Sequence, residues 1–171
     1  DRAKVKDILE VLDNQFRSIE RTPRAVKTLS EENLRDLLLG NLNSLFEGKA
    51  TGETFSNKGK TDIYLNIDQG SILVFECKIW GGKQLLWNTI VQLREYLTWR
   101  HNFGVIIIFS RLKNFINLLS EIPGNIQESK SYKHGYRKIK DNHFSAIHTL
   151  EDTDKEVEIH YLIFNLFCGE E

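Results

Sequence analysis

An uninterrupted apolar run near the middle of the chain restricts its fold more than any other feature. The run Val105-Ile106-Ile107-Ile108-Phe109 contains no polar residue, so a strand formed by it has to be covered on both faces. Helices on either side of a sheet provide such cover, and the arrangement is typical of parallel strands in α/β proteins. The run therefore predicts an α/β fold in which helices flank a central sheet.

Hydrophobic periodicity divides the chain into helices and strands. Apolar residues at helical spacing predict helices over 3–20, about 30–45, 84–100 and 111–120, with Ser30 as an N-cap and a stop at Pro123-Gly124. Alternating or continuous apolar residues predict strands over 53–56, 61–67, 71–79, 105–109, 143–149 and 157–167. Because 61–67 and 71–79 are expected to form an antiparallel hairpin, the expected fold is a mixed sheet flanked by helices, with an N-terminal helix and a C-terminal β-hairpin.

The composition fits one domain with a proper core. The chain has 171 residues, 40% of them hydrophobic and only 2 of them proline, and its formal net charge is −1. These values exclude a disordered tail, a collagen-like repeat and a disulfide-stapled miniprotein. We expect residues 1–27 to form a helical extension of the domain built by residues 28–171.

Three features bear on location and on the natural length of the protein. No run approaches the roughly 18 apolar residues of a membrane span, so we expect no membrane partner. Cys77 and Cys168 are the two cysteines, and both are expected to stay reduced in the cytoplasm. Because methionine is absent and residue 1 is Asp, we expect the sequence to be a piece of a longer chain with other domains.

Charge is distributed unevenly along the chain. Residues 111–140 carry 7 basic and 2 acidic side chains (+5), whereas residues 141–171 carry 1 and 8 (−7). Tyr132 and Tyr136 lie among the basic residues, so the first segment is suited to a phosphate backbone. An ordinary solvated surface, balanced by the acidic segment that follows, explains the same pattern equally well.

The register of the central hairpin decides whether two carboxylates meet. A two-residue loop would place Asp62 and Glu76 on opposite faces of the sheet. A three-residue loop 68–70, with Gly70 in the left-handed conformation, pairs residue 67 with residue 71. Asp62 then lies directly opposite Glu76, and the apolar residues of both strands share the other face. Loop chemistry and hydrophobic pattern thus predict the same register.

Two facing carboxylates need a cation between them, unless one of them is protonated. With Cβ atoms roughly 5 Å apart, the charges repel by about 3 kcal/mol at an effective dielectric constant of about 20. Oxygen ligands that converge in this way suit Mg²⁺, and Lys78, on the same face as Glu76, is suited to orient an attacking water. A salt-bridge ladder on an exposed hairpin is the alternative, but the apolar residues around Glu76 argue against a fully solvated face.

These residues resemble the motif of the PD-(D/E)XK superfamily, the restriction-endonuclease-like nucleases. The motif is an Asp (here Asp62), a gap of about a dozen residues, and Glu-x-Lys (here Glu76-Cys77-Lys78) on the next strand. An acidic helix begins upstream at Ser30-Glu31-Glu32, and Gln92 to Tyr96 looks like the Gln-x-x-x-Tyr signature of one large branch. The elements between residues 30 and 109 are similar to the family's αβββαβ core, so the resemblance covers about half of the chain.

The resemblance implies a role for each of these residues. Asp62, Glu76 and the backbone carbonyl of Cys77 correspond to the ligands of Mg²⁺, for which Mn²⁺ can substitute, and Lys78 to the catalytic lysine. Gln92 corresponds to a residue that reaches the site beside the lysine. One glutamate of the upstream helix completes the set. At 100° per residue, Glu31 falls inside the leucine face of that helix and Glu32 outside it, so we favour Glu31 and keep Glu32 as the alternative.

The reaction implied is the Mg²⁺-dependent hydrolysis of phosphodiester bonds in DNA, with RNA as a further substrate to test. In this family, such a domain often belongs to a larger prokaryotic defence or repair protein, and a homodimer would allow both strands of a duplex to be cut. The alternative function is a non-catalytic nucleic-acid-binding or scaffolding domain with the same fold.

Overall fold

The computed structural model describes residues 2–46, 50–52, 55–56, 59–60, 63–68, 71–97, 103–150 and 154–169. The helices are α1 (Arg2–Glu20), a 3₁₀ turn η1 (Pro23–Val26), α2 (Glu31–Leu45), α3 (Lys83–Tyr96) and α4 (Phe115–Gln127). The strands are β1 (Ala50–Gly52), β2 (Phe55–Ser56), β3 (Gly59–Lys60), β4 (Ile63–Asp68), β5 (Ser71–Ile79), β6 (Phe103–Ser110), β7 (Tyr132–Lys140), β8 (His143–Thr149) and β9 (Glu156–Asn165).

Seven of these strands form one mixed sheet in the order β1-β4-β5-β6-β9-β8-β7, and β2 pairs with β3 separately. The three central strands β5, β6 and β9 are parallel, and the outer strands run antiparallel to their neighbours. Ile79 pairs with Phe109, and Phe109 pairs with Phe164, so the carboxyl ends of the central strands lie side by side. The α/β class with a mixed sheet, the N-terminal helix and the C-terminal hairpin are confirmed.

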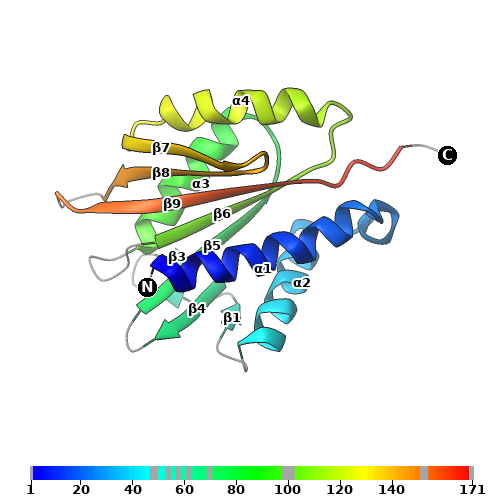
Figure 1. Cartoon of the computed structure of the whole chain (residues 1–171), viewed down its shortest axis with the longest axis horizontal. Coiled ribbons are helices and arrows are strands. Elements are labelled where there is room, and N and C mark those ends of the chain that lie inside the picture. The colour runs from blue at the N-terminus through cyan, green and yellow to red at the C-terminus, as the bar shows by residue number, and fades with distance from the viewer. Residues whose placement is uncertain are drawn as a thin grey trace.

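Helices cover both faces of the sheet (Figure 1). One hydrophobic core lies under α1 and α2, and a second lies under α3 and α4. Strand β6 contributes to both, because Val105, Ile107 and Phe109 belong to the first core and Ile106 and Ile108 to the second. The apolar run is therefore covered on both faces, as its composition predicts. None of the described helices combines the length and the apolar character needed to cross a bilayer.

The register of the central hairpin agrees with the sequence, but its turn does not. Ile63 pairs with Phe75 and Leu65 with Leu73, which is the predicted alignment. The predicted pair of residues 67 and 71 is wrong, because Asp68 pairs with Ser71 and the register shifts between Asn66 and Asp68. The extra residue in β4 is Ile67, which packs against the core under α1 and α2. A bulge that packs the half-buried Ile67 against this core thus gives the expected alignment with a shorter connection.

Two helix ends differ from their predictions. Helix α4 starts at Phe115 and continues through Pro123 to Gln127, since Leu118, Ile122 and Ile126 form one buried stripe that extends past the proline. Helix α3 ends at Tyr96, four residues before its predicted end at residue 100. The next residue, Leu97, is extended and buried, so the chain leaves the helix there while its side chain stays in the core.

Residues 132–140, the C-terminal part of the basic segment, form strand β7, which the sequence did not predict. Its cationic side chains are ion-paired: Lys133 and His134 with Glu156, Arg137 with Glu158, Lys138 with Asp141, and Lys140 with Asp13. The structure thus favours the interpretation of this segment as a surface balanced by nearby carboxylates. Strand β7 also lies four positions from β5 in the strand order, at the far edge of the sheet.

Helix α1 shares a hydrophobic core with α2 and the sheet. Its residues Leu12 and Phe16 are fully buried there, next to Phe109 and Phe164. Asp13, also buried, accepts hydrogen bonds from Asn142 and Lys140 and pairs with Arg17. The first helix is thus joined to the sheet by apolar and by polar contacts, and the boundary proposed between residues 27 and 28 stays a prediction.

Candidate active site

Glu31, at the start of α2, reaches across to the end of β5. The side chain of Ser30 caps the helix by accepting a hydrogen bond from the Asn33 N–H, which makes Glu31 the first helical residue. Its Oε2 accepts a hydrogen bond from the Ile79 N–H (3.0 Å), and its Oε1 lies 3.6 Å from Lys78 Nζ. Glu32 is exposed. Of the two glutamates considered, the structure therefore brings Glu31 to Lys78.

Glu76 and Lys78 lie on the face of β5 that α3 covers. Val74 belongs to the core under α3, while Phe75 and Cys77 belong to the core under α1 and α2. Because side chains alternate along a strand, Glu76 and Lys78 share the face of Val74. Glu76 is fully buried, and the Lys78 side chain is 20% exposed. A carboxylate at such depth is maintained only by hydrogen bonds or a neighbouring cation.

The hydrogen bonds at the end of β5 indicate to which side of the strand the carbonyl of Cys77 points. The N–H of Trp80 bonds to the carbonyl of Phe109 on the β6 side, whereas the N–H of Ile79 bonds to Glu31. Alternate residues of a strand direct their backbone groups to opposite neighbours. Cys77 therefore directs its carbonyl to the side that Glu31 occupies, while its thiol lies in the core. That side also bears Ile63, the first described residue of β4, which pairs with Phe75.

Gln92 lies on α3, on the flank away from α4 and β8. The opposite flank carries Trp87 and Arg94, whose side chains donate to the carbonyls of Asn125 and Thr149. At 100° per residue, Gln92 and Tyr96 lie on the other side of the helix, toward the half of the sheet that contains β5. Among the described contacts, Gln92 Nε2 donates to the Tyr96 hydroxyl (3.4 Å), and none joins Gln92 to Glu31 or Lys78.

Asp62 lies outside the described residues, so its position opposite Glu76 stays a prediction. Within the described part of the chain, no group of three or more His, Cys, Asp or Glu side chains could hold a metal ion. The donors that the described residues do offer are oxygens, the Glu76 carboxylate and the Cys77 carbonyl, and oxygen is the ligand type that Mg²⁺ prefers. The chemistry of this partial donor set fits Mg²⁺.

Arg111 is a structural contributor that the sequence did not reveal. It follows β6, and its Nη2 donates to the carbonyls of Val26 (3.2 Å) and Leu29 (2.5 Å). These bonds hold the segment just before Glu31 against the carboxyl ends of β5 and β6. Because an arginine after a strand carries no motif, only the tertiary structure could show this contact.

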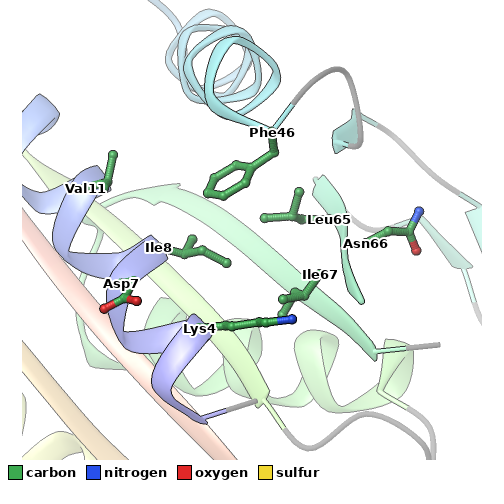
Figure 2. A pocket seen from close by; sticks show the side chains of 8 residues that line it. All are labelled: Lys4, Asp7, Ile8, Val11, Phe46, Leu65, Asn66 and Ile67. Carbon is green, nitrogen blue, oxygen red and sulfur yellow. The ribbon is translucent and has the colours of Figure 1, made fainter. Parts of the chain in front are cut away.

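An apolar cavity of about 270 Å³ lies elsewhere in the molecule, between α1, the end of α2 and β4 (Figure 2). Ile8, Val11, Phe46 and Leu65 line it, with Lys4 and Asp7 from the first turns of α1. Leu65 belongs to the core under α1 and α2, whereas Glu76 and Lys78 lie on the opposite face of the sheet. The cavity is therefore separate from the candidate site.

Comparison with known proteins adds no assignment, since no family model, curated protein or solved structure matches this chain.

The two glutamates at the start of α2 provide a matched pair of variants. Glu31→Ala removes both the contact with Lys78 and the acceptor of the Ile79 N–H, so we expect the nuclease activity that the sequence predicts to fall by about 10²-fold or more. Glu32→Ala changes an exposed side chain in the same helical turn, and its activity should stay within about twofold of the parent. Initial rates of DNA cleavage measure both effects. Equal rates for the two variants would contradict the placement of Glu31 in the site.

Proposed function

We propose that the chain is a Mg²⁺-dependent nuclease of the PD-(D/E)XK type that hydrolyses DNA. The observation that carries the proposal is the contact between Glu31 and Lys78, which come from distant parts of the sequence. The order α2, β1, β4, β5, α3, β6 also agrees with an αβββαβ core, with β2 and β3 inserted.

The buried state of Glu76 favours an enzyme over a non-catalytic binding domain. Burying a carboxylate is costly unless a cation or hydrogen bonds compensate it, and a plain structural strand would gain stability from an apolar residue at this position. Glu76 nevertheless lies among Val74 and Ile106 in a hydrophobic core. A role as a metal ligand explains why a charged residue stands there.

Each residue has a proposed task in hydrolysis. Glu76, the Cys77 carbonyl and, by the sequence prediction, Asp62 would hold Mg²⁺, which lowers the pKa of water and stabilises developing negative charge. Lys78 would orient the attacking water or donate hydrogen bonds to the phosphate oxygens. Glu31 holds Lys78 at one end of the site and fixes the Ile79 backbone. Gln92 would contact the substrate from the flank of α3.

Metal dependence tests the proposal directly. Supercoiled plasmid incubated with the purified chain and Mg²⁺ should be nicked or linearised, and a chelator should stop the reaction. Mn²⁺ should replace Mg²⁺, whereas Ca²⁺ should support binding with little cleavage. RNA offered in parallel decides the preferred polymer. Absence of cleavage with every metal, or cleavage that persists in the presence of chelator, would contradict the proposal.

A further inference from the structure

A group of cationic side chains lies near the carboxyl ends of β5, β6 and β9. None of these side chains belongs to the candidate active site. The segment 21–30 contains Arg21, Arg24 and Lys27 and no carboxylate, and the segment 111–114 contains Arg111 and Lys113 and no carboxylate. We call these five residues the basic rim.

Hydrogen bonds and a shared groove bring the parts of the basic rim together. Arg111 binds the carbonyls of Val26 and Leu29, on either side of Lys27. Arg21 and Phe115, which follows Lys113 by two residues, line one groove of about 360 Å³. The N–H of Leu166, just after β9, bonds to the carbonyl of Ser110. The corner between α1 and α2, the connection from β6 to α4 and the end of β9 all lie at the right of Figure 1.

The rim differs from β7 in how its charges are balanced. Arg21, Arg24, Lys27 and Lys113 are exposed. Among the described residues, no carboxylate forms an ion pair with Arg21, Lys27 or Lys113. The cationic residues of β7, by contrast, pair with carboxylates of their own chain. The rim therefore keeps a positive charge that β7 loses.

The carboxylates closest to the rim along the chain are mostly engaged elsewhere. Glu20 accepts a hydrogen bond from the Asn165 N–H, and Glu31 binds Ile79 and Lys78. Asp141, on another wall of the groove, pairs with Lys138. A hydrogen bond from a backbone N–H does not neutralise a carboxylate, so Glu20 offsets one charge of the rim, and the exposed Glu32 offsets another. The cations Arg21, Lys27, Arg111 and Lys113 outnumber these two carboxylates, so the rim is a net positive surface beside Glu31 and Lys78.

We propose that the basic rim binds the phosphate backbone of a DNA duplex and leads it to the site at Glu31 and Lys78. This inference rests on the proposed function, since it names the surface that would hold the substrate of that site. Exposed cations such as Arg21, Lys27 and Lys113, which form no ion pair among the described residues, release counterions when they contact phosphates, and this release is the main source of sequence-independent affinity. The ligands of α/β sheets also commonly bind beyond the carboxyl ends of parallel strands.

Two double variants with the same change of charge test the proposal. Lys27→Ser with Lys113→Ser removes two cations of the rim, and Lys133→Ser with Lys138→Ser removes two paired cations of β7. Both are made in a Lys78→Ala background and measured in chelator with a labelled 30-base-pair duplex, so cleavage does not interfere. Circular dichroism and thermal unfolding verify that each variant is folded.

The rim variant should bind more weakly, by roughly fiftyfold at 0.1 M salt, and the slope of log K against log salt should become less steep by about 2. The β7 variant should stay within about twofold of its parent. Equal losses in both variants, a loss in the β7 variant alone, or no loss in either would overturn the proposal. Tighter binding of a single-stranded RNA of equal length would overturn the choice of duplex DNA.

The outcome is distinguishable from failure of the proposed function. If the rim binds DNA as expected but the unsubstituted chain cuts no DNA with Mg²⁺, then the surface stands and the nuclease proposal fails. If the chain cuts DNA and the rim variant binds as tightly as its parent, then the nuclease proposal stands and this inference fails.

Discussion

A Lys78→Ala variant is expected to cleave DNA about 10²- to 10⁴-fold more slowly than the parent chain, which is the range of a lost proton-transfer or orienting group. Lys78 Nζ is the cation that the described structure places next to Glu31, 3.6 Å from its Oε1. In the proposed reaction, the attacking water and the phosphate of the substrate would then lose a hydrogen-bond donor, and no neighbouring side chain on β5 replaces it. Initial rates at saturating Mg²⁺ measure the effect.

The fold of this variant should be preserved, because the Lys78 side chain lies at the end of β5 and is partly exposed. Its unfolding midpoint should shift by only a few degrees at most, since exposed and half-exposed ion pairs contribute little to stability. Lys133→Ala, on the distant strand β7, is the matched control and should cleave at the parent rate. Full activity of Lys78→Ala would contradict the assignment of the site.

Two buried histidines should make the fold sensitive to mild acid. Burial lowers the pKa of His148 to about 3, and the cation of Arg94 adds to the effect. Burial and the neighbouring His160 lower the pKa of His143 to about 4. The His148 ring forms hydrogen bonds with Ser131 and Tyr161, and the His143 ring forms one with His160. Both histidines therefore stay neutral in the folded state at a pH where an unfolded chain would protonate them.

The sign of the effect follows from these pKa values. Below the ordinary value of 6.5, the unfolded chain binds protons that the folded chain does not, so stability falls as the pH decreases toward 4 and 3. At pH 5, each histidine contributes a loss of about 2 kcal/mol relative to pH 7.5. The carboxyl of Glu20 acts in the opposite direction, because burial raises its pKa. Urea unfolding at pH 7.5 and pH 5 measures the sum.

Variants separate the contribution of each histidine. His148→Gln should reduce the difference in unfolding free energy between pH 7.5 and pH 5 by about 2 kcal/mol, even if it lowers stability at both values. Equal stability of the parent chain at pH 7.5 and pH 5 would show that neither histidine titrates as its burial implies.

The elements that the sequence predicts well are those in which one local pattern decides the structure. Strand β6 is an apolar run, β8 was predicted over 143–149 and has those bounds, and the register of β4 and β5 follows from their shared apolar face. The predicted turn is wrong because the bulge at Ile67 packs this half-buried side chain against a core formed by distant helices. Local turn chemistry contains no information about that core.

Strand β7 shows the main limit of prediction from local hydrophobic patterns. Five of its nine residues are Lys, Arg or His, and the other four are Tyr132, Gly135, Tyr136 and Ile139, so its strand character depends on ladder bonds to β8 and on carboxylates of β9 and α1. The hydrogen bonds of Arg111 could not be predicted from the sequence either, since their acceptors are backbone carbonyls, which every residue has. In the candidate site, helix geometry favoured Glu31 over Glu32, but the flank on which Gln92 lies needed the contacts of α3 with α4 and β8.

The outer strand of the sheet also has a consequence for self-association. A long open edge can template another chain, and proteins prevent this with charged side chains and irregular pairing. Strand β7 has both: cations paired with nearby anions, and several shifts in its ladder with β8, where Gly135 has a φ of 72°. An incoming strand would have to strip these ion pairs of water and match an uneven backbone. The molecule should therefore resist aggregation through this edge even when it is concentrated.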